Sequence, residues 1–396
     1  MKEFKTILEA FKKVDFTQRK SALATVVKVR GSSYRSPGAR MLITDDGKWI
    51  GSISGGCLEG DALRKARQVM MSKVPMTVTY DTREESNQNL GIGLGCNGVI
   101  DVLIEPVDPN DINNPTLFFE SILRMNAPVA LATIFDGVDK TIIGNKLLLT
   151  PGNTALHNFS NQQLENMITT DLLAVFETKK SEAKKYRTDE GETEVFVELI
   201  QPTVSLIIFG GGFDARPVSQ LAKSLGWEVM VTDECVAHIA PIFFPDADKL
   251  SLCHREFIER DVNITPYTAC VLMSHNYEYD RDVLKKLLQS KTPYIGILGP
   301  RKRFDKMLKE FSEQDIEIGK EEFHRIHSPI GLDIGAEAPD EIAISIIAEI
   351  QSKFSNRSGG FLKYQNGPIH KRDPKSDQVF KQVYLNSETT HHAVQN

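Results

Sequence analysis

The stretch Ser205-Leu-Ile-Ile-Phe-Gly-Gly-Gly-Phe-Asp-Ala215 decides the fold of the C-terminal half of this 396-residue chain. Its first five residues are a short apolar run, which suits a strand buried on both faces. Three glycines follow and permit a sharp turn, and a helical pattern then continues to Leu225. Gly226 stands where a left-handed residue commonly ends a helix. The stretch therefore predicts a strand, a tight glycine loop and a helix in direct succession.

The same alternation of strand and helix continues downstream. Strands are predicted at Glu228–Thr232, Ala269–Met273 and Tyr294–Leu298, and helical patterns follow the last two. Alternating strands and helices with apolar runs indicate a doubly wound parallel sheet. We therefore expect an α/β protein with a Rossmann-like domain over residues 204–358 and a partly mobile C-terminal extension over residues 359–396.

The glycine loop has the spacing of a dinucleotide-binding motif. Gly210 and Gly212 let the backbone approach a pyrophosphate closely, and Ala215 is an accepted third member of the motif. Asp233 ends the next predicted strand, about 20 residues downstream, where an acid can accept a hydrogen bond from a ribose hydroxyl. Two interpretations stay open. The crevice binds NAD(P) or another dinucleotide, or the glycines serve packing and the crevice is empty or repurposed.

Two further side chains are expected at the same edge of the sheet, because loops at the carboxyl ends of parallel strands share it. His275 is an acid/base or ligand-binding candidate by its position, and a hydrogen-bonded structural histidine is the alternative. Arg301 stands near a predicted helix start and is suited to hold a phosphate.

The N-terminal part of the chain has a different pattern. Residues 1–107 contain β-branched runs, hairpin signals and one clear helical pattern, which predict an α+β domain. Turn-forming residues from Asp108 to Pro115 mark its end. Residues 108–203 are expected to form a connecting subdomain of mixed α and β structure, with the charged segment 179–194 as an exposed hairpin or loop.

The loop Ser54-Gly-Gly-Cys57 is a candidate site of the N-terminal domain. Gly55 and Gly56 allow a ligand to approach closely. A cysteine at the start of the predicted helix faces the positive end of the helix dipole, which favours the thiolate, and Glu59 in the first turn opposes this effect slightly. Cys96 lies in a second glycine-rich run. A packed, unreactive cysteine is the alternative for both positions.

Arg35 and Arg40 belong to a glycine-punctuated loop in the same domain. Together with the two thiols they predict a site that offers thiolate sulfur and anion-binding groups. A soft thiolate selects soft transition metals over magnesium or calcium. No histidine occurs before His157, which argues against a cysteine hydrolase with its base in this domain.

The composition excludes several classes of protein. The chain carries a formal net charge of −6, which argues against non-specific nucleic-acid binding. No apolar stretch approaches the roughly 20 residues of a membrane span, and the first residues lack the apolar core of a signal peptide. Five cysteines without a CxxC pair favour reduced thiols over disulfides or a structural zinc site. We expect a cytoplasmic protein without a membrane or nucleic-acid partner.

Several of these motifs, in this order, resemble the xanthine dehydrogenase accessory proteins of the XdhC/CoxI family. The matching stretches are Gly31–Arg40, Ser54–Glu59, Gly93–Gly98, Gly210–Ala215, Ser328–Gly335, Pro339–Ala343 and Gly367–His370. The family commonly has two glycines after its second cysteine, whereas here Asn97 precedes Gly98. Asparagine tolerates positive φ better than most residues, so the loop can keep its shape.

The resemblance implies a protein that binds the molybdenum cofactor (molybdopterin), protects it and delivers its sulfurated form to a xanthine dehydrogenase-type molybdoenzyme. It also implies an N-terminal XdhC/CoxI domain joined to the Rossmann-like domain, a homodimer, and a cysteine desulfurase as a further candidate partner. Cys57 and Cys96 are then the expected positions of a thiol in contact with the cofactor and its molybdenum.

The sequence contains no segment that combines a general base, a nucleophile and an orienting partner, which favours an accessory protein over an enzyme. The alternative is an NAD(P)-dependent oxidoreductase, based on the glycine loop and Asp233. A purely structural partner of a molybdoenzyme, with no ligand of its own, is a third hypothesis.

Overall fold

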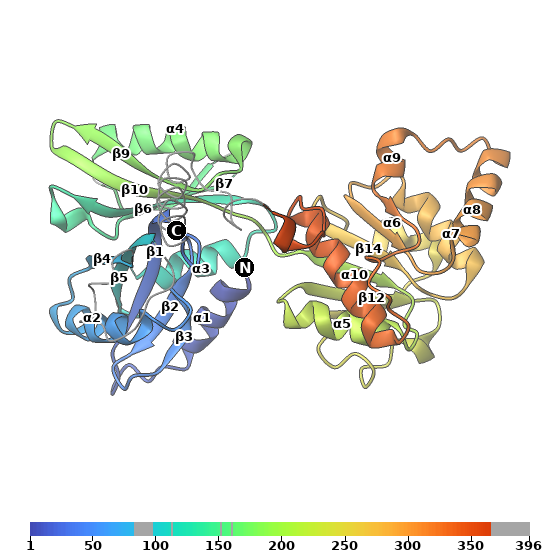
Figure 1. The fold of residues 1–396 in the computed structure, drawn as a ribbon, viewed down its shortest axis with the longest axis horizontal. Coiled ribbons are helices and arrows are strands. Elements are labelled where there is room, and N and C mark those ends of the chain that lie inside the picture. The colour runs from blue at the N-terminus through green and yellow to red at the C-terminus, as the bar shows by residue number, and fades with distance from the viewer. Residues whose placement is uncertain (83–97, 112–113, 151–152, 160, 366–396) are drawn as a thin grey trace, which may run out of the picture. The chain divides into compact units, whose positions relative to one another are not determined.

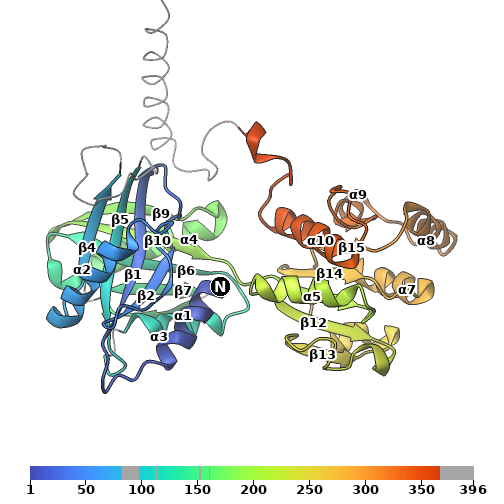
Figure 2. The same ribbon diagram turned by 60° about the horizontal axis from the view of Figure 1, so that its bottom comes forward.

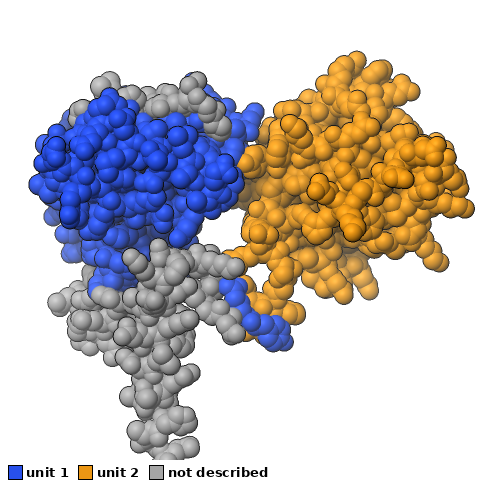
Figure 3. All heavy atoms as spheres, turned by 90° about the horizontal axis from the view of Figure 1, so that it is seen from above, with its two compact units in different colours: residues 1, 3–202, 364–396 blue, residues 2, 203–363 orange. Residues whose placement is uncertain are grey.

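The structure, a computed structural model, describes residues 1–82, 98–111, 114–150, 153–159 and 161–365. These residues fold into two compact units, which Figure 3 draws in separate colours. The described part of unit 1 consists mainly of residues 3–202, and unit 2 consists mainly of residues 203–363. Each unit has its own sheets and its own hydrophobic clusters, so each is described by itself.

Unit 1 begins with a five-stranded antiparallel sheet, sheet A. Its strands, in order of pairing, are β3 (Trp49–Gly51), β2 (Arg40–Thr44), β1 (Ser21–Gly31), β5 (Gly98–Val107) and β4 (Met76–Asp81). Helix α2 (Glu59–Ser72) covers one face of the sheet. Successive side chains of a strand point to opposite faces, so Ala22 and Val26 pack towards α2 while Leu23 packs on the other side. Both faces of β1 are buried, which explains its continuous apolar run.

A second antiparallel sheet, sheet B, packs on the other face of sheet A. Its order is β8 (Asn153–His157), β7 (Lys146–Thr150), β6 (Val129–Gly137), β10 (Gly191–Ile200) and β9 (Glu182–Thr188). Val27 and Leu103 of sheet A share one buried cluster with Phe196 of sheet B. Helix α4 (Gln162–Thr178) covers the outer face of sheet B, so unit 1 is layered as helix, sheet, sheet and helix (Figure 1).

Two more helices fill one side of this sandwich. They are α1 (Lys2–Lys12) and α3 (Pro115–Leu123), and they meet where the rings of Phe4 and Phe119 pack edge to face with centroids 4.8 Å apart. The buried residues of α1 include Ile7 and Leu8, and those of α3 include Phe118 and Ile122. The charged segment 179–194 was expected to be an exposed hairpin or loop, and the pairing of β9 with β10 makes it a hairpin. Residues 108–203 were expected to form a connecting subdomain, but the described ones up to Pro202 lie in the same compact unit as sheet A.

Buried ion pairs join sheet A to sheet B. Arg40 of β2 donates to both carboxylate oxygens of Glu198 on β10, at 3.1 and 2.5 Å, and the two side chains are only 4% and 10% exposed. Lys146 of β7 in sheet B forms a second buried ion pair, with Glu105 of β5 in sheet A. Burial lowers the pKa of the Lys146 ammonium below its usual value, although Glu105 opposes the shift. A buried charge without its partner is costly, so these pairs restrict how the two sheets can pack.

Unit 2 contains one parallel sheet, sheet C. Its strands, in order of pairing, are β13 (Lys249–Leu252), β12 (Glu228–Asp233), β11 (Ser205–Phe209), β14 (Thr268–Leu272), β15 (Tyr294–Ile297) and β16 (Ile326–His327). The chain starts in the middle of the sheet, builds one half and then crosses to build the other, which is the strand order of the Rossmann fold. The predicted α/β class and Rossmann-like domain are confirmed.

Helices cover both faces of sheet C. The helices of unit 2 are α5 (Ala215–Ser224), α6 (Ile258–Asp261), α7 (Tyr277–Leu287), α8 (Arg301–Glu313), α9 (Lys320–His324) and α10 (Pro339–Phe354). Figure 2 shows α5 and α10 side by side on one face, where they share a cluster of buried aliphatic residues, and α7 and α8 enclose a second cluster on the other face. Within the described ranges, every helix is too short or too polar to cross a membrane.

We predict that Glu198→Ala destabilises the protein far more than Glu192→Ala, a change on the same strand. Glu198→Ala leaves the Arg40 guanidinium buried without its carboxylate, at a cost of about 3–5 kcal/mol. Glu192 pairs with Lys185 at the surface, 2.7 Å away, and exposed pairs contribute little. Urea unfolding of the full chain, followed by circular dichroism, compares the variants. Equal losses of stability would contradict the structural role of the buried pair.

Candidate functional site

Two loops lie at one end of sheet A, where β4 also ends and β5 begins. β1 ends at Gly31, which pairs with Gly98, the first residue of β5. Antiparallel neighbours run in opposite directions, so the loop after β1 and the loop after β3 both lie at this end. They contain two of the N-terminal sequence motifs, in residues 32–39 and 52–58, whereas the third motif falls almost entirely outside the described residues. The tertiary structure therefore brings two motifs that are separate in the chain to one end of one sheet.

Gly98 packs against the first of these loops. A Cβ at Gly98 would lie 2.1 Å from the carbonyl oxygen of Ser32, so only glycine fits there. The hydroxyl of Thr82 donates to the carbonyl oxygen of Gly98 at 2.7 Å and accepts from its N–H at 3.0 Å. These contacts bring together the two ends of the connection between β4 and β5. Cys96 lies outside the described residues, so its contact with a cofactor stays a prediction.

One buried carboxylate holds the loop that carries Cys57. Glu59 begins α2, is 4% exposed, and accepts hydrogen bonds at Oε1 from Ser52 Oγ (2.9 Å) and Ser54 N (2.8 Å). At Oε2 it accepts from Ser54 Oγ and from Leu58 N (3.2 Å). Burial alone would raise the pKa of Glu59, but the hydrogen bonds from Ser54 and Ser52 outweigh it and hold the pKa below its usual value. The ionised carboxylate thus anchors the loop between β3 and α2.

Cys57 lies on this loop and is half-buried. It precedes the first residue of α2 by two positions, so the helix starts slightly later than the sequence predicted, because the loop before it is bonded to the Glu59 carboxylate. Gly56 has a φ of +113°, which favours glycine, and a Cβ there would meet no described atom within 4 Å. The loop therefore combines a bend that needs glycine with a position, next to the cysteine in the chain, that is free of other described atoms.

Tyr34 joins this loop to the loop after β1. Its ring atoms lie 3.4 to 3.6 Å from the position that a Cβ of Gly55 would take, so the absence of a side chain at Gly55 lets the ring pack on the backbone. The Tyr34 side chain is nevertheless 68% exposed. The two predicted motifs, Gly31–Arg40 and Ser54–Glu59, therefore form one continuous surface.

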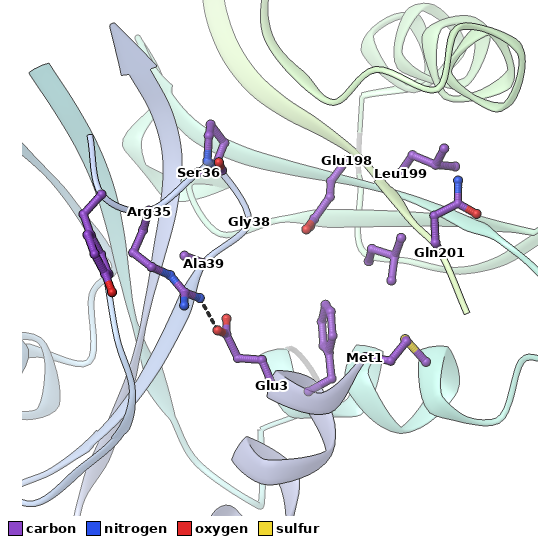
Figure 4. Close-up of a pocket in the computed structure, with 13 residues that line it drawn as sticks. Met1, Glu3, Arg35, Ser36, Gly38, Ala39, Glu198, Leu199 and Gln201 are labelled. Carbon is purple, nitrogen blue, oxygen red and sulfur yellow. Dashed lines mark hydrogen bonds and ion pairs between the residues drawn. The ribbon is translucent and has the colours of Figure 1, made fainter. Parts of the chain in front are cut away.

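A pocket of about 750 Å³ opens beside these loops (Figure 4). Its walls are the first turn of α1, residues 34–39 of the loop after β1, and residues 198–201 at the end of β10. The guanidinium of Arg35 and the carboxylate of Glu3 point towards each other at the mouth of the pocket and form an ion pair. Tyr34 belongs to the pocket wall as well as to the Cys57 loop surface, so the pocket and the thiol loop are neighbours.

The two arginines predicted to bind an anion have different environments. Arg40 is buried, with its guanidinium bonded to Glu198 and to the carbonyl oxygen of Gly38 at 2.6 Å, and it lies 4.5 Å from the centre of the Phe4 ring. Arg35 is 32% exposed at the pocket. A ligand can therefore reach the guanidinium of Arg35, whereas the guanidinium of Arg40 is buried and already paired.

The glycine loop of unit 2 packs against its own chain. A Cβ at Gly210, which has a φ of +116°, would lie 2.4 Å from Cα of Ser274, and a Cβ at Gly211 would lie 2.5 Å from the carbonyl oxygen of His238. Asp233 is buried at the end of β12, accepts from the N–H of Gly211 at 2.8 Å, and lies 3.0 Å from Nδ1 of His238. Close packing thus supports the interpretation that glycines of this loop serve packing. The Asp233 carboxylate, predicted to contact a ribose, is hydrogen-bonded to the loop itself.

The other predicted residues of this edge lie near the glycine loop. Ala215 is fully buried at the start of α5, where its small side chain permits close packing on the sheet. His275 has a φ of +60°, and its Nε2 lies 3.2 Å from a carboxylate oxygen of Asp214. A Cβ at Gly212 would lie 3.5 Å from the His275 ring. His275 is therefore an exposed histidine paired with an acid beside the loop.

Arg301 begins α8 and donates to Asp305 at 3.1 Å and to the carbonyl oxygen of Ser328 at 3.2 Å. The predicted residues accordingly form two groups, one in each unit. The group in unit 1 comprises Gly55, Gly56, Cys57, Arg35 and Arg40. The group in unit 2 comprises Gly210, Gly212, Ala215, Asp233, His275 and Arg301.

Sequence reasoning missed three residues of the site in unit 1 and underrated a fourth. Glu3, Tyr34 and Glu198 were not predicted, and Glu59 was expected only as an acid in the first helical turn. Glu59 stands five residues after Ser54, which is not the spacing of a capping box, so the sequence pattern did not reveal these hydrogen bonds. Among the described side chains, no group of three His, Cys, Asp or Glu residues is placed to hold a metal ion.

Comparisons with known proteins match both units. Residues 17–81 match a family model described as the XdhC and CoxI family, and residues 206–350 match one described as the XdhC Rossmann domain. The chain is 31% identical over 354 residues to a probable xanthine dehydrogenase subunit of Bacillus subtilis (strain 168), a match that covers 88% of this chain and 97% of that protein. It is 23% identical over 350 residues to the molybdenum cofactor insertion chaperone PaoD of Escherichia coli (strain K12), a match that covers 88% of each.

A crystal structure described as a xanthine dehydrogenase from Bacillus halodurans matches with a TM-score of 0.72 and 30% identity, over 90% of this chain and 97% of that chain. The fold and the site define a two-unit protein in which a double-sheet unit with a cysteine-bearing loop is followed by a Rossmann unit. The chain belongs to the XdhC and CoxI family, and the predicted resemblance is confirmed.

We predict that Glu59→Gln destabilises the protein by about 1–3 kcal/mol at neutral pH, because the amide cannot accept all the hydrogen bonds that the carboxylate accepts. The pKa of Glu59 lies below its ordinary value of 4.5, so this contribution is present above that pH and is lost as the pH falls below it. Urea unfolding at neutral and at acidic pH tests both points, with Glu9→Gln on the exposed side of α1 as the control. Wild-type stability of Glu59→Gln at neutral pH would contradict the anchoring role.

We also predict that the thiols react with iodoacetamide at different rates. Burial raises the pKa of Cys270 to about 12 and raises the pKa of Cys253, and the thiolate is the reactive form. Half-buried Cys57 and exposed Cys235 should therefore be modified in the native chain well before Cys253 and Cys270. Peptide mass spectrometry over a time course measures the order, and urea should abolish the difference. A Cys57 as slow as Cys270 would show that the loop is closed.

Proposed function

We propose that this protein binds the molybdenum cofactor and delivers it, in sulfurated form, to a xanthine dehydrogenase-type enzyme. The observation that carries the proposal is the half-buried Cys57 on a loop anchored by Glu59, at the end of sheet A where two motif-bearing loops lie. A thiolate is a soft ligand and suits a transition metal that is already held by sulfur. The name of the PaoD relative, a molybdenum cofactor insertion chaperone, supports the same chemistry.

The residues of unit 1 fit the chemical groups of this cofactor. When bound, it supplies a molybdenum ion held by an anionic dithiolene, joined to a pterin and a phosphate. Cys57 would contact the metal side of the ligand, and Gly55 and Gly56 keep the backbone free of side chains there. Arg35, at the mouth of the pocket, would hold the phosphate, because a guanidinium matches phosphate geometry.

The anchoring of the loop explains how a single cysteine can serve as a binding group. Four hydrogen bonds to Glu59, three from Ser52 and Ser54 and one from the N–H of Leu58, hold the chain on both sides of Cys57, so the thiol needs little further ordering when a ligand binds. Cys96 is the proposed second thiol. A homodimer, and a cysteine desulfurase as the source of sulfur, complete the proposal.

Unit 2 is assigned no cofactor in this proposal. Asp233 is bonded to the N–H of Gly211, and both Gly210 and Gly211 lie too close to neighbouring backbone to carry a side chain. These contacts account for Gly210 and Gly211 through packing, whereas a Cβ at Gly212 would meet only the His275 ring, at 3.5 Å. They supply no specific support for hydride transfer with NAD(P).

Retained molybdenum tests the proposed function. The purified full chain is incubated with isolated molybdenum cofactor, desalted, and assayed for molybdenum by mass spectrometry. We expect Cys57→Ser to retain at least about tenfold less metal, since loss of an outer-shell partner alone typically costs 10–100-fold in affinity. Cys235→Ser removes an exposed cysteine of unit 2 and should retain the wild-type amount. Equal retention by Cys57→Ser contradicts the role of the thiol, and no retention by the wild type contradicts the proposed function.

A further inference from the structure

We propose that the pocket between α1, residues 34–39 and the end of β10, called the α1 pocket below, binds the pterin ring of the cofactor. This inference rests on the proposed function, because it places a second part of the same ligand next to the Cys57 loop. The chemistry it recognises is a flat ring with a 2-amino-4-oxopyrimidine edge, joined to an anionic group. Guanine nucleotides share that chemistry, so the experiment below separates the two sources.

The size and lining of the α1 pocket suit a small organic ligand. Its volume of about 750 Å³ lies within the range of about 300–1,000 Å³ that is usual for ligand sites. Phe4, Pro37 and Ile200 supply apolar surface. The charged lining residues include Glu3, Arg35 and Glu198, which Figure 4 labels. An apolar wall with a small number of placed polar groups is the general pattern of such sites.

Tyr34 supplies a stacking surface and connects the pocket to the thiol. Its ring rests on the backbone of Gly55 and yet is 68% exposed, although it contributes to no buried cluster of unit 1. An exposed aromatic ring held against the backbone offers its remaining surface to a flat heterocycle, which it binds by offset stacking. Gly55 is two residues from Cys57, so a ring stacked on Tyr34 lies beside the loop that carries the thiol.

Glu3 and Arg35 supply the polar recognition. The side chains of this ion pair are 27% and 32% exposed, whereas Glu198, which also lines the pocket, forms a buried pair with Arg40. A carboxylate accepts the paired N–H donors of a 2-amino-4-oxopyrimidine edge through charge-assisted hydrogen bonds, and a guanidinium matches a phosphate. The backbone N–H of Arg40 donates to Glu3 Oε1 at 2.5 Å and keeps that carboxylate in place. When the ring edge binds to Glu3, the Arg35 guanidinium is released, and its long side chain can extend to the anionic group at the other end of the ligand.

Fluorescence titration of the full chain with pterin-6-carboxylate, a stable fluorescent pterin, tests this site without any metal. We expect Tyr34→Leu and Glu3→Gln each to weaken binding about tenfold, since stacking and charged hydrogen bonds each contribute at least this much. Phe213→Leu changes an equally exposed aromatic residue of unit 2, and Glu9→Gln changes an exposed glutamate of α1. Both controls should bind the probe as the wild type does.

Three results would overturn the α1 pocket as a pterin site. They are no binding of the probe by the wild type, unchanged binding by both Tyr34→Leu and Glu3→Gln, and displacement of the probe by guanosine monophosphate at equal concentration. The last result would make the pocket a guanine nucleotide site. Tyr34→Leu removes an exposed side chain, so its effect remains interpretable even if Glu3→Gln perturbs the fold.

Molybdenum retention by the same variants separates this inference from the proposed function. If Cys57→Ser loses molybdenum while Tyr34→Leu and Glu3→Gln retain the wild-type amount, the α1 pocket is wrong and the proposed function stands. If the wild type binds the pterin but retains no molybdenum, the proposed function fails while the pocket is supported. Loss of molybdenum in all three variants, with both controls unchanged, supports one continuous site.

Discussion

The bidentate ion pair between Arg40 and Glu198 is the contact on which unit 1 depends. It crosses the interface between sheet A and sheet B, and the same guanidinium lies over the Phe4 ring of α1 and donates to the carbonyl oxygen of Gly38. A buried charge cannot be left unpaired without a large loss of stability. Sheet A, sheet B, α1 and the loop that contains Gly38 must therefore pack together in one arrangement. The same arrangement shapes the α1 pocket, because its lining residue Glu3 accepts a hydrogen bond from the backbone N–H of Arg40.

A second buried carboxylate shapes the thiol loop. Apolar packing is not directional, whereas hydrogen bonds fix both distance and angle. Ser52 and Ser54 donate to Glu59, and this is what positions the backbone next to Cys57. The candidate site of unit 1 is therefore built from polar contacts placed on an apolar double-sheet scaffold. Such a site can be rearranged by changing one carboxylate while the core of the sheets stays intact.

Unit 2 shows that a fold and a motif do not by themselves define a ligand. Its strand order is that of the Rossmann fold, and its glycine loop has the expected spacing. Yet Asp233 is bonded to Gly211, and the nearest groups to the loop are the chain's own His238 and Ser274. The same residues that bind a dinucleotide in one protein can close the turn onto the sheet in another, because both uses need glycine at the turn.

The sequence by itself determined the features that depend on neighbours in the chain. The apolar run Ser205–Phe209 with its glycine turn predicted the parallel sheet, and the charged segment 179–194 predicted a hairpin, because strand period and turn chemistry are local properties. Only the tertiary structure decided the partner of Arg40, which lies 158 residues away on another sheet, and so decided that its charge is buried rather than offered to an anion. The contact between Tyr34 and Gly55 could not be predicted from the sequence either, and nor could the α1 pocket. Both arise only when separate loops and sheets pack together.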